Sequence, residues 1–576
     1  MNLGLPAWAE EMRDLFKSGS VSQFLLHGNV FDTVVTPGLT EPRLLSLGAF
    51  LDEVMFEKYD VILHYDRGKG IRATRGADDW GEWLRLALGD QASSMVQLRE
   101  PGAAMELIDR YLLRTLNLQA LRGREYGPKK IAVIVEYAEF VVPRGDPLHL
   151  GGAFSSNVVK VLGWANDPAI LRSDVVTVLI AEGLHDLNSL AVENPHAAAL
   201  NIPLPDEQEM SEYIKMLAAT SLQGLDSKCE ISLDALSRRL TGLSRVGAYT
   251  VLARALKNEK ALTSKWLTRM KKERIEKECQ GLLEFLESTF TLDNLSGSEN
   301  VKAWLREDAA LMRQGILHAL PMGYLITGRI GTGKTFLIQC WAGELGIPCV
   351  IFKNFRDRWV GATESNLEKI FSILRALGQV VVFVDEADQA AGKREGSDSD
   401  GGLSGRVYAM LAKEMSDTRN RGRIIWVFAT SRPDLLEVDL KRQGRLDVHI
   451  PMFPPETPEE MNSLFLAVAR KLKVQVTESD IPEIPKNLSI GGNEIEGILV
   501  RALRIQALAS PVQRPLREIL TEVLREARPS AHRLKMEYMD LVAVKECTDS
   551  RFLPERFRTI EPDELDRKIE DLRRFI

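Results

Sequence analysis

The second half of the chain alternates short, mostly apolar segments with longer segments of helical periodicity. The apolar segments lie at residues 323–327, 349–352, 380–384, 424–429 and 448–450. Fully apolar strands separated by helices are typical of a parallel sheet that is covered on both faces. After Glu456 only helical periodicity remains, and it opens with Pro458. The pattern therefore predicts an α/β domain at 290–455, a helical lid at 456–519 and a helical tail of unassigned role at 520–576.

The first half repeats this order of elements with weaker signals. Its apolar segments lie at 24–26, 61–64, 131–135, 175–180 and 199–203, and helical segments follow at 206–218 and 233–256. The shared order predicts a duplication on the scale of a whole domain, with residues 1–256 as the first copy. The alternative is that two unrelated α/β domains share the same alternation. Residues 257–289 are predicted to form a charged helical linker, usually a solvated element, although its excess of Lys and Arg also admits phosphate binding.

Composition narrows the class of protein. The chain has 576 residues, of which 45% are hydrophobic and 27% charged, as is typical of a soluble protein with several domains. The net charge of -7 argues against a protein that coats nucleic acid, although a local basic groove stays compatible with it. The five cysteines lack C-x-x-C spacing, which fits a reducing compartment. No secretory signal and no apolar run near the ~20 residues of a membrane span occur, so we expect a cytoplasmic protein without a membrane partner.

A glycine-rich segment follows the first apolar strand of the second half. Residues 328–335 read GRIGTGKT, which fits GxxxxGK[ST] between a strand and a helix. Glycines let backbone N–H groups turn toward phosphate, and the start of the helix adds partial positive charge. Lys334 is expected to reach the β- and γ-phosphates of ATP, and Thr335 to offer its hydroxyl to Mg²⁺. The predicted nucleotide-binding residues here are Gly328, Ile330, Gly331, Thr332, Gly333, Lys334, Thr335 and Phe336.

Two adjacent carboxylates end the apolar run at 380–384. Parallel strands present their carboxyl ends at the ligand edge of a sheet, so Asp385 is expected to hold Mg²⁺ and Glu386 to polarise the attacking water. The alternative is a strand capped by solvated acids. Ser431 follows the next apolar strand, where a small polar side chain can touch the γ-phosphate or its water. The sequence therefore predicts a catalytic edge formed by Lys334, Asp385, Glu386 and Ser431.

Residues 290–508 resemble a module of the AAA family of ATPases, in the branch that includes valosin-containing protein and the FtsH proteases. The phosphate loop and the acidic strand resemble the Walker A and Walker B motifs. Further segments match in order at 290–297, 358–365, 401–415 and 491–495. The resemblance implies adenine contacts from Leu295, Gly297, Gly492 and Asn493. It also implies a pore loop that consists of Trp359, Val360 and Gly361 and touches a protein client.

Arg442 and Arg445 stand three residues apart before the last apolar strand. Surface arginines are usually solvated, but in a chain that resembles this family the pair suits arginine fingers, which act on the nucleotide of a neighbouring subunit. The resemblance therefore implies a homo-oligomer, of which a hexameric ring is one form.

Some positions depart from the family pattern. Ser431 stands where the family usually has Asn, and Arg329 begins a pair where it commonly has two prolines. The first half also looks AAA-like, but it has no GK[ST] after its first strand, and Glu136 and Tyr137 stand where its acidic motif would end. That half is therefore predicted to bind no ATP. The combination is similar to the hypothetical-open-reading-frame AAA ATPases of bacteria and chloroplasts.

Three functions are compatible with the sequence. The first is an ATP- and Mg²⁺-dependent remodeller that threads an unknown protein client. The second is a nucleotide-gated scaffold whose inert first half binds a partner. The third, a nucleic-acid-dependent ATPase, is supported only by the basic linker. No HExxH motif is present, so the metalloprotease that is fused to some relatives is not expected.

Overall fold

The computed structural model describes most of the chain. It leaves undescribed residues 1–4, 37–42, 90–98, 124–129, 147–148, 226–228, 230, 258–262, 280, 354–362, 389–400, 485–489, 509–513, 528–531 and 575–576. The described residues form two compact units, one of residues 1–275 with 361–376 and one of residues 276–360 with 377–576. Each unit contains its own six-stranded sheet.

The sheet of the second unit has the strand order β14-β10-β13-β12-β11-β9. Its strands are β9 (Leu283–Phe285), β10 (Gly323–Thr327), β11 (Cys349–Phe352), β12 (Val380–Val384), β13 (Ile424–Thr430) and β14 (Val448–Pro451). All neighbours pair in parallel except β9, which pairs antiparallel with β11 at the edge. The predicted strands are thus present, and the parallel α/β fold is confirmed.

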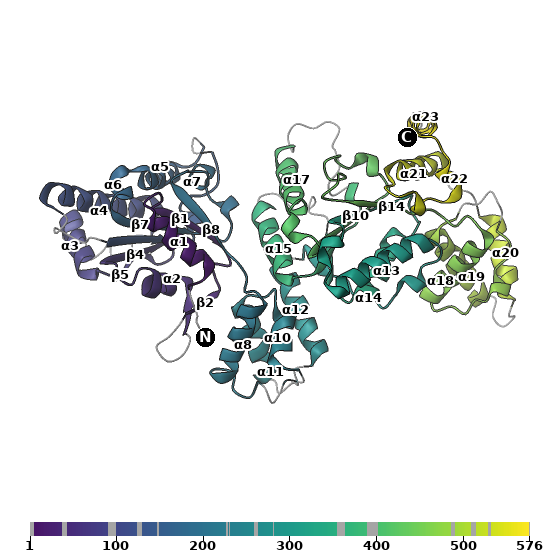
Figure 1. Cartoon of the computed structure of the whole chain (residues 1–576), viewed down its shortest axis with the longest axis horizontal. Coiled ribbons are helices and arrows are strands. Elements are labelled where there is room, and N and C mark those ends of the chain that lie inside the picture. The colour runs from purple at the N-terminus through teal and green to yellow at the C-terminus, as the bar shows by residue number, and fades with distance from the viewer. Residues whose placement is uncertain are drawn as a thin grey trace. The chain divides into compact units, whose positions relative to one another are not determined.

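Two helices cover one face of this sheet. They are α13 (Glu299–Gln314) and α14 (Lys334–Leu345), which lie next to each other in Figure 1. Leu305 and Trp341 from these helices share a buried core with Tyr324 and Phe383 from the strands. These strand residues alternate with others that face the opposite side, as the period of two requires. The predicted segment 401–415 is helix α17 (Gly401–Met415).

The lid forms a separate helical core. It consists of α18 (Pro458–Lys471), α19 (Gly492–Leu508) and α20 (Leu516–Glu526). Helix α18 begins at the predicted proline and has a capping box, in which Thr457 and Glu460 satisfy each other's backbone N–H groups. Helix α20 continues past residue 519, where the sequence predicts that the lid ends.

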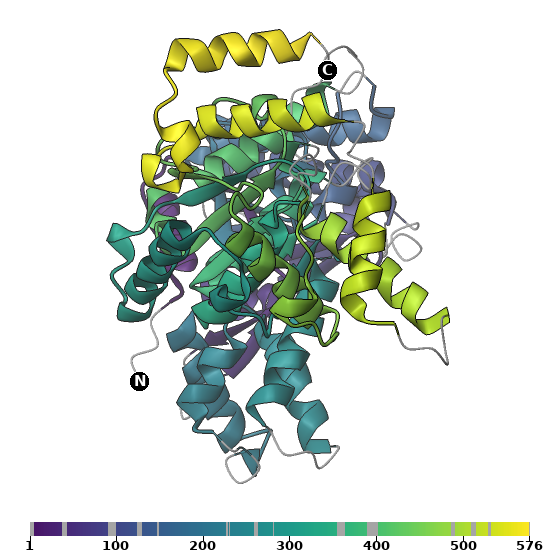
Figure 2. The same cartoon turned by 90° about the vertical axis from the view of Figure 1, so that its right-hand side faces the viewer.

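The tail returns to the α/β domain of the same unit. It forms α21 (Arg533–Glu546), η10 (Ser550–Phe552), α22 (Glu555–Arg558) and α23 (Pro562–Arg573). Figure 2 shows α21 and α23 as two yellow helices above the sheet. Phe552 enters the core between the sheet and α13. The tail is therefore a packed part of the domain and not a solvated extension.

The sheet of the first unit has the order β5-β4-β6-β7-β1-β8. Its strands are β1 (Gln23–Gly28), β4 (Val61–Asp66), β5 (Gly70–Arg75), β6 (Lys130–Val135), β7 (Asp174–Ile180) and β8 (Ala197–Ile202). The five parallel strands follow the same spatial order as those of the second unit, and an antiparallel strand again pairs at the same edge. The topology thus supports the predicted duplication.

The first unit also contains elements that the sequence pattern did not predict. A hairpin, β2 (Thr33–Thr36) with β3 (Arg43–Ser46), leads into α2 (Leu47–Phe50) and the π-helix η1 (Leu51–Met55). These elements stand where the second unit has its phosphate loop. The other helices of this unit are α1 (Ala7–Lys17), α3 (Ala77–Leu88), α4 (Pro101–Arg122), α5 (Gly152–Asn166), α6 (Pro168–Leu171), α7 (Ser189–Val192) and α15 (Thr363–Leu377).

A helical domain completes the first unit. Its helices are α8 (Glu207–Ala219), α10 (Leu233–Leu240), α11 (Arg245–Lys257) and α12 (Ser264–Glu278). Helix α12 is the charged segment that was predicted to be a linker. Arg239 on α10 donates to the Thr268 hydroxyl on α12 at 3.3 Å, which ties the two helices together.

Among the residues that the structure describes, no helix is both long and apolar enough to cross a bilayer.

Candidate active site

The phosphate loop connects β10 to α14. Gly328 (φ +135°), Gly331 (φ +88°) and Gly333 (φ +87°) take the left-handed region of φ that favours glycine. A Cβ on Gly328 would also lie 2.2 Å from the carbonyl oxygen of Met452, so no larger residue fits there. Helix α14 begins at Lys334, and its N-terminal end therefore faces the loop.

The Lys334 amine is hydrogen-bonded to the backbone of its own phosphate loop. Its Nζ donates to the carbonyl oxygens of Gly328 at 2.7 Å and Arg329 at 3.0 Å. Burial lowers the pKa of Lys334 to about 8, although nearby carboxylates such as Asp385 oppose that shift. A bound phosphate would replace these carbonyl acceptors with stronger anionic ones and favour the charged amine.

The acidic motif follows β12 and meets the start of α14. The Thr335 hydroxyl donates to Asp385 Oδ2 at 2.8 Å, and the Glu386 backbone N–H donates to Asp385 Oδ1 at 2.9 Å. Glu386 has φ +48°, a rare conformation for a residue other than glycine, and it is exposed. A hydroxyl and a carboxylate in contact are hard oxygen ligands of the kind that Mg²⁺ prefers, so these residues fit the predicted ion.

The end of β13 adds a residue to the predicted set. The Thr430 hydroxyl donates to Asp388 Oδ1 at 2.5 Å and accepts from the Arg432 backbone N–H at 2.9 Å. The predicted Ser431 lines the same pocket. The sequence analysis did not single out Thr430 because this residue lies within the strand itself. A hydroxyl at the end of an apolar strand was the signal that could have identified it.

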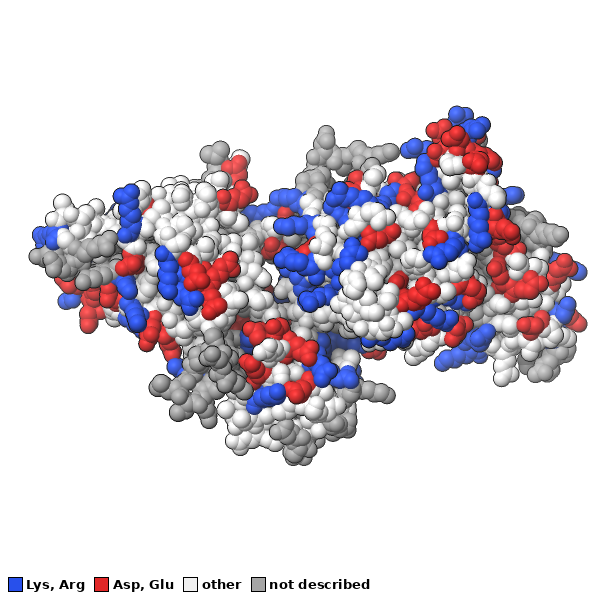
Figure 3. All heavy atoms as spheres, viewed as in Figure 1, with Lys and Arg blue, Asp and Glu red and all other residues white. Residues whose placement is uncertain are grey.

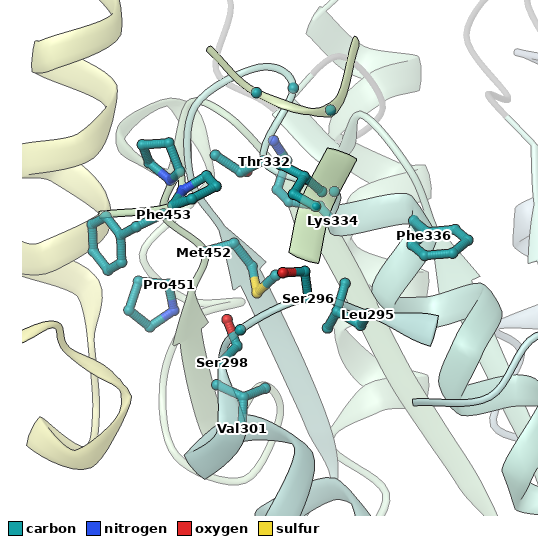
Figure 4. Close-up of a pocket in the computed structure, with 18 of the residues that line it drawn as sticks. Leu295, Ser296, Ser298, Val301, Thr332, Lys334, Phe336, Pro451, Met452 and Phe453 are labelled. Atoms are coloured by element: carbon teal, nitrogen blue, oxygen red, sulfur yellow. The ribbon is translucent and has the colours of Figure 1, made fainter. Parts of the chain in front are cut away.

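The loop, the acidic motif and the strand end surround one pocket of about 830 Å³. Its lining includes most of the predicted nucleotide-binding and catalytic residues: Leu295, Gly297, Ile330, Gly331, Thr332, Gly333, Lys334, Thr335, Phe336, Asp385, Glu386, Ser431, Gly492 and Asn493. Figure 4 shows side chains of the segment that precedes and opens α13 (residues 290–301, the leading segment), of the phosphate loop and of residues 451–453 around this space. The lining segments that the sequence missed include residues 451–456, residues 551–554 with Arg558, and the α18 residues Glu460, Leu464, Ala467, Val468 and Lys471.

Close backbone contacts join the lid and the leading segment to the part of the pocket that the phosphate loop and α14 form. The Gly492 N–H donates to the Gly331 carbonyl at 3.0 Å, which joins the lid to the phosphate loop. A Cβ on Gly343 of α14 would lie 2.0 Å from the carbonyl oxygen of Phe290, so a glycine lets the leading segment run along the helix. Ser296 Oγ donates to the carbonyl of Glu460 at 3.0 Å. These contacts bring the segments that resemble adenine-binding motifs to one pocket.

The two predicted arginine fingers differ in exposure. The Arg442 side chain is 62% exposed and lies 3.1 Å from Asp439 Oδ1. The Arg445 side chain is 8% exposed, forms an ion pair with Asp439 and donates to its carbonyl oxygen at 2.8 Å. Arg442 is thus available at the surface, whereas Arg445 faces the interior. The predicted pore loop of Trp359, Val360 and Gly361 lies outside the described residues.

The first unit closes the corresponding position with its own side chains. Glu136 and Tyr137 follow β6 as Asp385 and Glu386 follow β12, and Tyr137 has φ +53°. Glu136 already has a partner within its own unit, because its Oε1 lies 2.7 Å from Nδ1 of the buried His64.

His64 has a second carboxylate partner. Its Nε2 lies 2.7 Å from Asp52 Oδ1. Burial by itself lowers the pKa of His64, but the hydrogen bonds that its ring donates to Asp52 and Glu136 outweigh it and raise the pKa to about 9. The imidazolium and Arg72, whose Nη2 lies 3.4 Å from Glu136 Oε1, therefore compensate the charge of the acid that corresponds to the predicted Mg²⁺ ligand.

The same unit joins its helical domain to its sheet without a nucleotide. Buried Asp32 accepts from the backbone N–H groups of Arg245 and Val246 at 2.8 and 2.9 Å, which caps the start of α11. Asn29 Nδ2 also donates to Asp32 Oδ2 at 2.9 Å. This carboxylate lies where a βα phosphate loop would present its backbone.

The strand order, the glycine loop before α14 and the acidic strand end define a P-loop nucleotide-binding domain with a helical lid. Comparison with known families narrows this class. Residues 324–453 match the model of the ATPase family associated with various cellular activities (AAA). Residues 2–203 match the N-terminal Rossmann-like domain of AAA+ chaperones, and residues 208–280 match their second helical domain. Residues 324–453 are therefore an AAA domain, and the predicted linker helix lies within the helical-domain match.

Individual relatives align with only part of this chain. The ATP-dependent zinc metalloprotease FtsH 1 of Symbiobacterium thermophilum is 32% identical over 179 residues, which are 30% of this chain and 30% of that protein. The peroxisomal ATPase pex6 of Schizosaccharomyces pombe is 31% identical over 238 residues, 39% of this chain and 24% of that protein. Protein SAV of Sulfolobus acidocaldarius is 36% identical over 139 residues, 24% of this chain and 18% of that protein. The alignments span less than a third of the length of each of these relatives.

Proposed function

We propose that the protein hydrolyses ATP in the pocket of the second unit. The observation that carries this proposal is the junction of Thr335, Asp385 and Glu386, in which the hydroxyl at the start of α14 contacts the acidic strand end. Such a junction lies where the γ-phosphate of a nucleotide on the loop would be placed.

Each residue of the junction has a distinct task in this proposal. Lys334 exchanges its loop carbonyls for phosphate oxygens and compensates their charge. Thr335 and Asp385 hold Mg²⁺, which neutralises charge on the phosphates when it is bound. Glu386 orients the attacking water and accepts its proton, and its exposed position in the pocket lining leaves room for that water. Thr430 donates its hydroxyl to Asp388 and so holds the end of the acidic motif beside these residues.

We further propose that the subunits assemble head to tail and remodel a protein client. Exposed Arg442 supports the assembly, because a residue on the surface can reach the nucleotide of a neighbour. The matches to AAA+ chaperone domains support a protein client. A nucleic-acid client receives no such support, and Figure 3 shows basic and acidic side chains alternating over the C-terminal helices.

A nucleotide-gated scaffold is the second candidate. The observation that favours it is the first unit, where His64 and Asp32 close the position that a nucleotide would take. A unit locked in one conformation is suited to bind a partner. Stimulation of ATP turnover by an unfolded protein favours the remodeller, whereas a turnover that no unfolded protein or DNA changes favours the scaffold.

The central test compares two variants of the pocket. Glu386→Gln should retain nucleotide affinity and lower turnover by at least ~100-fold, because only the proton acceptor is lost. Lys334→Ala should remove nucleotide binding altogether, since the first unit, which lacks the GK[ST] motif, is predicted to bind no ATP. Isothermal titration with an ATP analogue and a phosphate-release assay measure both, and Glu570→Gln on the exposed face of α23 is the control. Near wild-type turnover in Glu386→Gln would refute the assignment of the base.

A further inference from the structure

Helix α21 buries polar side chains as well as apolar ones. Residues 538–544 are all buried, although they include the polar side chains of Tyr538 and Asp540. A carboxylate is rarely buried unless it is paired, so its position needs a physical reason. The contacts of these two residues lead to the ATP pocket.

Asp540 forms an ion pair with the phosphate loop. Its Oδ2 lies 3.7 Å from Nη1 of Arg329, and the two side chains are only 11% and 9% exposed. Oδ1 of Asp540 is buried and has no hydrogen-bond partner among the described residues. Breaking a buried pair is costly because it leaves a charge uncompensated. The buried pair therefore favours one position of the Arg329 side chain.

The restraint on Arg329 reaches the catalytic lysine. The backbone carbonyl of Arg329 accepts from Lys334 Nζ at 3.0 Å and from the Thr332 hydroxyl at 2.9 Å. A shift of Arg329 would thus move two acceptors that set the shape of the loop. Asp540 can position the lysine without touching a nucleotide.

Tyr538 reaches the strand end on the other side of the pocket. Its hydroxyl donates to Asp434 Oδ2 at 3.0 Å, and Asp434 pairs with Arg432 through Nε and Nη2 at 3.0 and 2.8 Å. The Arg432 guanidinium also lies 5.3 Å from the centre of the Tyr538 ring. The Arg432 backbone N–H donates to Thr430, which contacts Asp388. A chain of contacts therefore runs from α21 to the acidic motif.

The segment after α21 contributes to the pocket wall itself. Residues 551–554 and Arg558 line the same space as the phosphate loop. Phe552 packs edge-on against Trp304 of α13 at 5.5 Å, and Asn300 Nδ2 donates to the Arg551 carbonyl at 2.8 Å. These contacts hold the segment in place beside the leading segment of the domain.

We propose that residues 533–558 are a working part of the ATP site, in which Asp540 positions the phosphate loop through Arg329 and Tyr538 positions the strand end through Asp434. Asp540 and Tyr538 are positioning residues and not catalytic ones. The proposal rests on the proposed ATP hydrolysis. It assigns a role to a tail that the sequence left without one.

A double-mutant cycle on the full chain tests the first contact. Asp540→Asn keeps the shape of the side chain and should lower kcat/KM for ATP roughly 10-fold. In an Arg329→Ala background the same substitution should have no further effect, because the partner through which it acts is gone. Asp540→Glu should restore part of the activity. Asp566→Asn, which breaks an exposed ion pair with Lys545 in the same tail, is the matched control and should leave kcat/KM unchanged.

The pH profile separates positioning from a merely structural role. Burial raises the pKa of Asp540 to about 6, against the opposing charges of Arg329, Arg556 and Lys334, and Glu537 adds to the rise. Wild-type kcat/KM should therefore fall as the pH drops through about 6, because the ion pair is lost. The profile of Asp540→Asn should lack this step. A step that persists in the variant would overturn the proposal.

Tyr538→Phe provides a second, independent variant. It removes the hydroxyl from Asp434 while it keeps the ring beside Arg432, so folding is preserved even if Asp540→Asn is unstable. We expect kcat to fall several-fold and the affinity for an ATP analogue to stay within twofold. Equal kcat in wild type and Tyr538→Phe, or additive effects in the Arg329–Asp540 cycle, would refute the role of the tail. A wild-type protein without ATP turnover would instead refute the proposed function.

Discussion

The carboxyl ends of β12 and β6 show how two sheets of the same topology came to differ. Both strands lead into a residue with positive φ, Glu386 in the second unit and Tyr137 in the first. The preceding acid faces the pocket lining in one unit, as Asp385, and a buried histidine in the other, as Glu136. The backbone of the two sites is alike, and the side chains decide whether a ligand can enter.

The two units compensate the charge of the strand-end carboxylate in different ways. A carboxylate at a strand end needs a counter-charge when it is partly buried. In the proposed function the second unit leaves that role to a bound ion and nucleotide, whereas the first supplies His64 and Arg72 from its own chain. Asp32 likewise caps α11 where the second unit joins its lid through Gly331 and Gly492. We therefore expect the first unit to need no ATP to hold this fold.

The largest expected effect concerns Arg442, an exposed side chain of the second unit. Arg442→Ala should lower ATP turnover by ~10³-fold with little change in nucleotide affinity, because a finger mainly stabilises transition-state charge. Its neighbour Gln443 is also exposed, so Gln443→Ala is the control. Mixing Arg442→Ala with Glu386→Gln subunits should restore part of the turnover. The absence of restoration in verified mixed oligomers would remove the case for a finger acting between subunits.

The next effect concerns His64 of the first unit, which contacts both Asp52 and Glu136. The folded pKa of His64 is about 9, above the ordinary value of 6.5, so its ionised form stabilises the fold below pH 6.5 and this contribution is lost as the pH rises through 9. His64→Gln should reduce the free energy of unfolding by about 3 kcal/mol at pH 6. Denaturant unfolding at pH 6 and pH 10 measures the difference, which should shrink at the higher pH. A difference that is independent of pH would contradict the assignment.

The smallest effect concerns Asp32, which caps the start of α11 in the helical domain. Asp32→Ala should destabilise the first unit by about 1 kcal/mol, the usual cost of losing a helix cap. Amide hydrogen exchange at Arg245 and Val246 should become faster, because their N–H groups lose their acceptor. ATP turnover by the second unit should be unchanged, and Asp14→Ala on the exposed face of α1 is the control. Unchanged exchange at these two amides would show that Asp32 does not hold the helix.

Much of the fold was predictable because strand and loop signals are local. The apolar runs at 349–352 and 380–384 coincide with β11 and β12, since buried parallel strands are apolar on both faces. The phosphate loop was predictable because its glycines and Lys334 serve one local geometry. The fold class and the AAA assignment followed from these features.

Other features depend on contacts between distant parts of the chain. Strand β9 has three residues and pairs only with β11, so no period of two could reveal it. The pairing of Asp540 with Arg329 and the burial of Arg445 follow from tertiary packing and leave no trace in the local pattern. The same is true of His64, whose partners Asp52 and Glu136 come from different elements.

The ion pair between α21 and the phosphate loop also sets an order of events during synthesis. Arg329 leaves the ribosome about 210 residues before Asp540, a delay of roughly 10–40 s at ordinary rates of translation. During that time the growing chain has a phosphate loop whose arginine lacks its buried carboxylate. The nascent AAA domain therefore lacks this ion pair of its phosphate loop until helix α21 has emerged.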